Sequence, residues 1–200
     1  MHISSRFKQI LVISVLSCCA SAASDQYFPE GIFSENAADD KAWSDRFSRQ
    51  LVALDEPPLR VAAGSPFQSY RFLWQRSFHP ALAVRLDVQQ DGTGIVVTKM
   101  SRTVKGSKRA GVETTRRVLA KQETDGFLRQ IHDSGFWKMS TRLNPIDVGP
   151  DGAQWLLEGF KGHNYHAVLR WSPKDGSVRT LGLKLAIDLG GLRIPGDQIY

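Results

Sequence analysis

The stretch "DGAQWLLEGFKGHNYHAVLRWSP", residues 151–173, gives the clearest indication of how this chain folds. It consists of two apolar segments separated by a short polar turn at Gly162 and His163, which is typical of a β-hairpin. A turn at this point places Leu157 opposite Val168, and the neighbouring positions also match apolar with apolar side chains. We therefore predict an antiparallel hairpin with this register.

In this register the side chains alternate between two faces, and each face mixes apolar with polar groups. One face holds Glu158, Phe160, Tyr165, Leu169 and Trp171, and the other holds Trp155, Leu157, His166, Val168 and Arg170. Apolar residues on both faces are typical of strands that are covered on both sides. The register also sets Arg170 opposite Trp155, where a guanidinium can stack on the indole.

Alternating apolar residues predict further strands before this hairpin. The positions that share one side are Tyr70, Phe72 and Trp74 in the first segment, and Leu82, Val84, Leu86 and Val88 in the second. A turn at Asp91-Gly92 predicts that residues 82–101 form a hairpin. Residues 114–122 add a candidate fourth strand after a basic loop.

Apolar residues at helical spacing occur in three places. The first helix follows Asn36, a residue type favoured at the N-cap, and ends before Pro57. The second begins at Thr124 as its cap and ends at Gly135, and the third covers residues 177–191. The order of elements predicts a single α+β domain over residues 36–200, with a largely antiparallel sheet of five or six strands and about three packed helices.

The first 22 residues have the organisation of a secretory signal peptide. Arg6 and Lys8 precede an apolar run, and Ala20-Ser21-Ala22 forms a small-x-small cleavage site. The run is shorter than the roughly 20 residues that span a bilayer, so we predict a cleaved leader and no transmembrane helix. We expect a periplasmic or secreted protein, with residues 23–35 as a flexible lead.

Cys18 leaves an alternative open. It follows small and apolar residues in "VLSC", as in the signal of a bacterial lipoprotein, and would then carry a lipid anchor. Cys18 and Cys19 are the only cysteines of the chain, so cleavage after Ala22 leaves no disulfide.

The chain is mildly basic, with a formal net charge of +6. Between Lys99 and Lys121 there are eight Lys or Arg residues and one acid, Glu113. Such a patch could bind an anionic envelope polymer, lipid headgroups or nucleic acid. Its glycines and its lack of aromatic residues for base stacking favour a solvated hairpin loop and disfavour nucleic acid.

Two residues of the hairpin are candidates for catalysis. Glu158 lies among aromatic residues, where a buried carboxylate needs a charged or hydrogen-bonded partner or a raised pKa. With His166 it could serve a hydrolase, whereas a structural salt bridge is the explanation that we favour. His163 and His166 are three apart in an extended hairpin and point to opposite faces, so we predict neither a metal nor a cofactor.

The segment "FLWQRSFHPALAVRLDV" and the hairpin resemble a family of bacterial exported proteins in which similar Trp-x-Leu-Glu-Gly and Tyr-His-x-x-x-Arg-Trp-Ser-Pro strands recur. The resemblance implies no activity, because none is established for that family. The matching positions are Phe78, His79, Arg85, Trp155, Glu158, Tyr165, His166, Arg170 and Trp171.

Together these observations predict an exported protein of the bacterial cell envelope that acts as a non-catalytic binding module. Its partner would be an envelope protein or an anionic envelope polymer. The predicted ligand-binding residues are His79, Arg85, Trp155, Tyr165, Arg170 and Trp171. Two alternatives are a hydrolase using Glu158 with a histidine, and an inhibitor or immunity-type module that binds protein through Tyr, Trp and Arg anchors.

Overall fold

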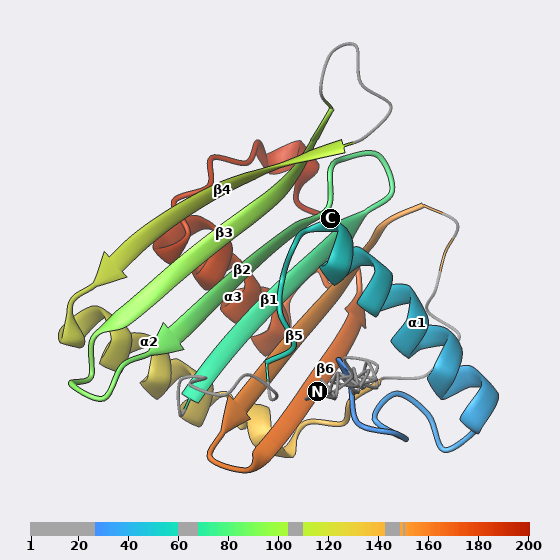
Figure 1. The fold of residues 1–200 in the computed structure, drawn as a ribbon, viewed down its shortest axis with the longest axis horizontal. Coiled ribbons are helices and arrows are strands. Elements are labelled where there is room, and N and C mark those ends of the chain that lie inside the picture. The colour runs from blue at the N-terminus through green and yellow to red at the C-terminus, as the bar shows by residue number, and fades with distance from the viewer. Residues whose placement is uncertain (1–26, 60–67, 104–109, 143–148, 150) are drawn as a thin grey trace, which may run out of the picture.

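The computed structural model describes residues 27–59, 68–103, 110–142, 149 and 151–200. They form one antiparallel sheet of six strands, with helices packed on both of its faces (Figure 1). This arrangement confirms the predicted α+β fold. The leader, its cleavage site and Cys18 lie outside the described residues.

The sheet has the strand order β4-β3-β2-β1-β5-β6, and every neighbouring pair is antiparallel. The strands are β1 (Gln68–Arg76), β2 (Leu82–Val88), β3 (Gly94–Thr103), β4 (Ala110–Leu119), β5 (Ala153–Lys161) and β6 (Asn164–Trp171). The helices are α1 (Ala37–Ala53), α2 (Lys121–Asp133), the 3-10 turn η1 (Phe136–Lys138), α3 (Gly176–Leu183), its π-helical continuation η3 (Lys184–Leu189) and the 3-10 turn η4 (Gly196–Gln198).

The predicted register of the last hairpin is confirmed. Leu157 lies opposite Val168 and Trp155 opposite Arg170. β5 also pairs with β1, so this hairpin extends the sheet formed by β1 to β4.

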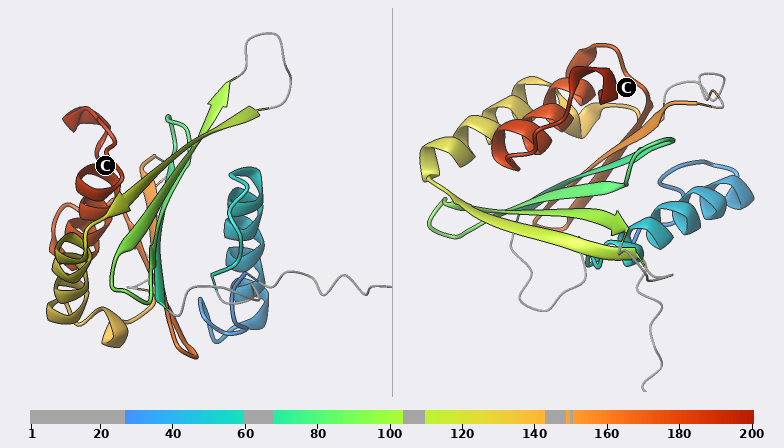
Figure 2. Two further views of the ribbon diagram at one scale, coloured as in Figure 1. Left: turned by 60° about the vertical axis from the view of Figure 1, so that its left-hand side comes forward. Right: turned by 90° about the horizontal axis from the view of Figure 1, so that it is seen from above.

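The elements form three layers, with α2 and α3 on one face of the sheet and α1 on the other (Figure 2). The larger core lies under α2 and α3, where the sheet contributes Tyr70, Phe72 and Trp74 and the helices contribute Phe127 and Leu181. These aromatic residues are those whose alternation predicted β1. The smaller core lies under α1.

The lead before α1 is packed from Tyr27 onward, which corrects the prediction of a flexible segment over residues 23–35. Tyr27, Phe28 and Phe33 are buried in the core under α1. The Asp40 carboxylate of α1 accepts hydrogen bonds from the main-chain N–H groups of Gly31 and Phe33, which fixes the turn that carries these aromatic rings.

The second helix begins one turn earlier than predicted. Thr124 is not its cap, since it lies inside α2 and its hydroxyl donates to the Ala120 carbonyl oxygen. The Glu123 carboxylate instead accepts the main-chain N–H of Ala120. Gly135 adopts a left-handed conformation after the helix, as predicted, with φ of 68°.

Candidate functional site

Glu158 is part of a buried ion-pair network on the α1 side of the sheet. We define this network by the residues Glu56, Arg71, Arg85, Asp87, Lys99 and Glu158. Arg71 donates two hydrogen bonds of 2.7 Å to the two carboxylate oxygens of Glu158, and both side chains are fully buried. The Tyr165 hydroxyl donates a third, at 2.8 Å. Glu158 is therefore held by a bidentate pair, the strongest geometry for such an interaction.

Arg71 and Arg85 lie directly opposite each other on β1 and β2. Like charges in that position repel. Glu56, in the segment after α1, relieves the repulsion because its Oε2 lies 3.6 Å from Arg71 Nη1 and 3.0 Å from Arg85 Nε. Burial alone would lower the pKa of Arg71, but the charges of Glu158 and Glu56 outweigh it and raise that pKa.

Two further charges complete the network at its more exposed end. Asp87 forms an ion pair with Arg85 and accepts a hydrogen bond of 2.9 Å from the Ser69 hydroxyl. Lys99 on β3 lies 3.5 Å from Glu56 Oε1 and donates to the main-chain oxygen of Asp55. Three carboxylates thus face three cations, and the side chains hold one another in place.

His166 lies on the other face of the sheet from Glu158, so the structure does not assemble the two candidate catalytic residues. The His166 ring packs against Phe136, with ring centroids 5.1 Å apart, and lies beside Trp137. Its Nε2 is buried without a hydrogen-bond partner among the described residues. Burial is the main cause that lowers its pKa.

Arg170 does not stack on Trp155, which corrects the sequence prediction. Its guanidinium donates to the main-chain oxygens of Ser140 and Thr141, at 3.1 and 3.2 Å. The cation over the Trp155 ring is Arg179 of α3, 5.7 Å from the ring centroid. Arg170 therefore ties β6 to the segment that follows η1.

His79 and Trp155 meet at Tyr200. The Tyr200 hydroxyl lies 2.8 Å from His79 Nδ1, and the indoles of Trp74 and Trp155 donate to its main-chain oxygen at 3.2 and 2.8 Å. Trp171 is half-buried elsewhere, at the end of β6. The predicted ligand-binding residues are thus divided among separate structural contacts, with only Arg85 and Tyr165 in or beside the ion-pair network.

The surface that sequence reasoning missed lies on β3 and β4, next to the network. α1 packs on Leu73, Leu156 and Leu169 of β1, β5 and β6. The segment after α1 contacts Lys99 on β3, but no described helix or strand covers the rest of this face of β3 and β4 (Figure 1). We call this surface the open sheet face, and its residues are Arg85, Asp87, Ile95, Val97, Arg116 and Val118.

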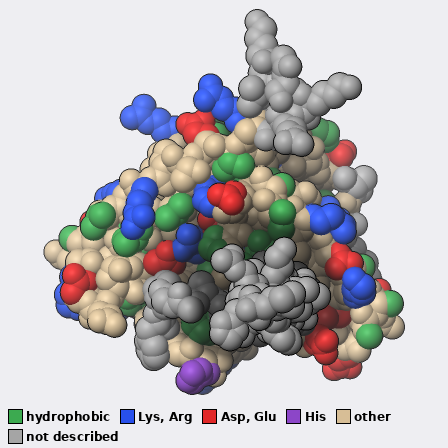
Figure 3. All heavy atoms as spheres, viewed as in Figure 1, with side chains coloured by type: hydrophobic (Ala, Val, Ile, Leu, Met, Phe, Trp, Pro, Cys, Tyr) green, Lys and Arg blue, Asp and Glu red, His purple; other side chains and the backbone are tan. Residues whose placement is uncertain are grey.

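The open sheet face combines apolar and basic side chains. Ile95 lies opposite Val118, and Val97 lies between Arg85 and Arg116. Val118 is 69% exposed, and Arg116 is exposed with no hydrogen bond or ion pair to another described residue. Figure 3 views this side of the molecule, where apolar and basic side chains lie next to one another over the β3 and β4 part of the sheet. The exposure of Val118 is known only from the structure, because alternation in the sequence does not show which face of the sheet has no described helix over it.

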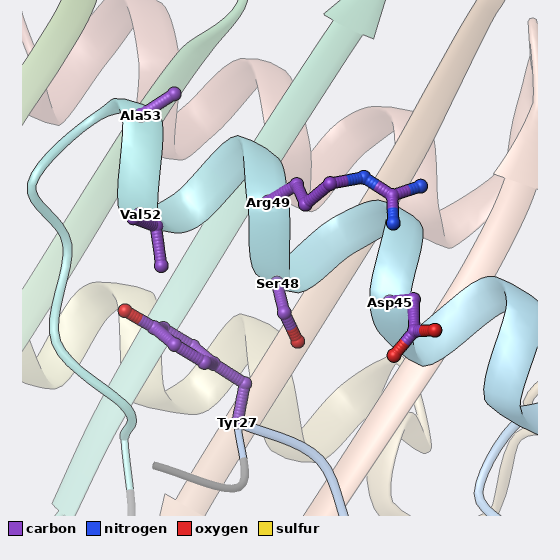
Figure 4. A pocket seen from close by; sticks show the side chains of 6 residues that line it. All are labelled: Tyr27, Asp45, Ser48, Arg49, Val52 and Ala53. Atoms are coloured by element: carbon purple, nitrogen blue, oxygen red, sulfur yellow. The ribbon is translucent and has the colours of Figure 1, made fainter. Parts of the chain in front are cut away.

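Two hollows lie away from this surface. One, of about 460 Å³, lies on the solvent side of α1 (Figure 4). Its walls are Tyr27, Asp45, Ser48, Arg49, Val52 and Ala53. The other, of about 220 Å³, lies between α2 and η3. Neither contains any predicted site residue.

The chain matches no protein-family model, and no curated protein is similar to it in sequence. Over the part of the chain that the structure describes, no three His, Cys, Asp or Glu side chains are grouped so that they could hold a metal ion. None of the described helices has both the length and the apolar character needed to cross a bilayer. The geometry of the sheet therefore carries the functional argument.

Proposed function

We propose that this chain is an exported, non-catalytic binding module of the bacterial cell envelope, which holds a partner protein on the open sheet face. The observation that carries the proposal is a strip of sheet that no described helix or strand covers, where Ile95, Val97 and Val118 surround Arg116, whose charge has no partner among the described residues. An exposed apolar patch with a polar border is characteristic of interaction surfaces.

The ion-pair network supports this proposal, because it makes the adjacent surface rigid. Arg85 is held by Glu56 and Asp87, and Lys99 is held by Glu56 and the Asp55 main chain. A surface whose side chains are already fixed loses less conformational entropy when a partner binds. Strands of a sheet also move less than loops.

The chemistry of the patch favours a protein over an anionic polymer. Three branched apolar side chains need apolar groups opposite them, and a polysaccharide phosphate or a lipid headgroup supplies few. Arg116 calls for a carboxylate beside those apolar groups. We therefore expect the partner to present an acidic residue flanked by aliphatic or aromatic residues.

The geometry gives the hydrolase alternative little support. Glu158 is closed in by Arg71 and Tyr165, and His166 lies on the opposite face. A general acid or base must reach the proton that it transfers. Glu158 instead forms a structural salt bridge with Arg71.

Photo-crosslinking in living cells tests the proposal. A photoreactive phenylalanine analogue at Val97, in the middle of the open sheet face, should give a covalent adduct with one other protein, identified by mass spectrometry. The Arg116→Glu variant should reduce that adduct strongly. The matched control places the analogue at His132, which is exposed on α2. The same adduct from both positions, or none from Val97, would contradict the proposal.

Export is tested separately, because a binding module could act in another compartment. The protein recovered from the periplasm should begin at Ala23 when its N-terminus is sequenced. A soluble product that retains Met1 would refute export, and a lipid on Cys18 would show the membrane-anchored alternative.

A further inference from the structure

We infer that β4 is a self-association edge, through which two copies of this chain pair and continue the sheet across a two-fold axis. β4 is an outermost strand of the sheet, ten residues long, and no described segment lies beyond it (Figure 1). An uncovered edge strand presents a row of main-chain donors and acceptors that another strand can pair with.

The opposite edge of the sheet, β6, is partly covered by another segment of the chain. The main-chain N–H of Leu169 on β6 donates to the Thr141 oxygen at 2.7 Å, and Arg142 forms a parallel bridge with the same residue. Part of the β6 edge is thereby covered within the chain. β4 has no such cover among the described residues, and its positions from Glu113 to Val118 are all exposed.

The charges of β4 select one register. A two-fold axis perpendicular to the sheet sets one residue opposite its own copy. An axis at Glu113 or at Arg116 would place like charges opposite each other, which is unfavourable. An axis at Thr114 would pair Glu113 with Thr115, with no gain in charge.

An axis at Thr115 makes the strand complementary to itself. Glu113 then faces Arg117 of the second copy, and Val112 faces Val118, each pair occurring twice. This register explains why a valine that is 69% exposed stands on an edge strand. It also leaves only threonine opposite Arg116.

The charges on both sides of the paired β4 strands alternate in sign. Within one copy, Arg117 donates to Glu123 at 2.6 Å, and Arg102 lies 3.8 Å from Glu113. All four side chains lie toward the α2 side of the sheet. Pairing therefore produces a row in the order Glu123, Arg117, Glu113 and Arg102, with the last two from the second copy. Networks of this kind gain more than isolated surface pairs.

Sedimentation of the mature chain, residues 23–200, tests the inference. The wild type should form a dimer in a concentration-dependent manner. Glu113→Arg and Arg117→Glu should each weaken dimerisation at least tenfold, because each places like charges opposite one another. Val52→Lys, at another exposed apolar position on α1, is the matched control and should leave dimerisation unchanged.

Charge exchange makes the test specific for this register. Equal amounts of the two single variants should form a mixed dimer, and the double variant should dimerise again as the wild type does.

Because the new glutamate in Arg117→Glu also faces Glu123, circular dichroism must show that this variant folds. If it does not, Thr115→Arg, which sets two arginines on the axis, should abolish the dimer while the monomer stays folded. A wild type that stays monomeric at every concentration, or a Glu113→Arg variant that dimerises fully, would overturn the inference.

Discussion

Glu56 is the residue on which the charge balance under α1 depends. It lies between Arg71 and Arg85 and also faces Lys99, and its side chain is fully buried. No motif in the sequence indicates this role, because Glu56 precedes Pro57 in what reads as a helix end. The three cations come from three different strands, so only the folded sheet brings them to one carboxylate.

Glu56→Gln should destabilise the fold by about 3–5 kcal/mol, the usual cost of removing one partner from a buried ion pair. The variant leaves three cations, of which Arg71 and Lys99 are buried, facing two carboxylates. Urea unfolding at neutral pH measures the loss. Asp133→Asn, which removes an exposed carboxylate on α2, is the control and should leave the midpoint unchanged. A midpoint for Glu56→Gln equal to that of wild type would show that water or neighbouring groups replace the lost charge.

His166 should make stability depend on pH. Its pKa in the folded protein is lowered, chiefly by burial and further by the charge of Arg170, from an ordinary value of 6.5. The unfolded chain therefore takes up the proton first as the pH falls. The contribution of neutral His166 is complete above about pH 6.5 and is lost progressively below it, down to the folded-state pKa.

The measurement is the urea midpoint at pH 7.5 and at pH 5.5, compared between the wild type and His166→Gln. The wild type should lose more stability on acidification than the variant does. His132→Gln changes an exposed histidine and should keep the pH dependence of the wild type. An equal loss in wild type and His166→Gln would assign the pH dependence to other groups.

At the level of the elements, alternation in the sequence was a good guide to strands, and Asn36 caps the first helix as predicted, whereas the start of the second helix was placed too late. The alternation of Tyr70, Phe72 and Trp74 reflects a real difference between two faces, so β1 could be predicted locally. Thr124 has the chemistry of a cap, yet it is buried in α2 because the Glu123 side chain serves that end of the helix instead.

Glu123→Ala should therefore lower stability by about 1 kcal/mol, as expected for the loss of a helix-end hydrogen bond. Part of the loss comes from the contact with Arg117. Thermal unfolding gives the difference, with Gln122→Ala as the control on the same turn. If Thr124 were the effective cap, the two variants would behave alike.

The lead before α1 was predicted to be flexible, because the sequence does not show what its aromatic rings contact. Phe33 is 3% exposed, and its ring centroid lies 5.0 Å from that of Phe28 and 5.4 Å from that of Phe47. Phe33→Ala should cost about 3–5 kcal/mol, as for other buried aromatic residues. Denaturant unfolding measures this, and Val52→Ala, an exposed change on α1, should cost far less. A small effect of Phe33→Ala would indicate that the lead is flexible, as the sequence predicted.

At the scale of the whole molecule, the order of elements could be predicted from sequence, but the position of the last hairpin could not. Local patterns predicted β5 and β6 together with their register. Nothing local indicated that β5 would pair with β1, since that pairing joins Arg71 to Glu158 across 87 positions. The sequence also could not show that Glu158 and His166 would lie on opposite faces of the assembled sheet.

The distance along the chain between β1 and β5 has a consequence for the order of folding. β2, β3 and β4 follow one another as a meander, whereas the β1–β5 pairing closes a long loop, which costs more entropy. We expect the meander to form first and the last hairpin to dock late. The ion pair between Arg71 and Glu158 would then form after the rate-limiting step. Glu158→Gln should then accelerate unfolding and leave the refolding rate nearly unchanged in stopped-flow measurements. Slower refolding would mean instead that this distant contact is already made in the transition state.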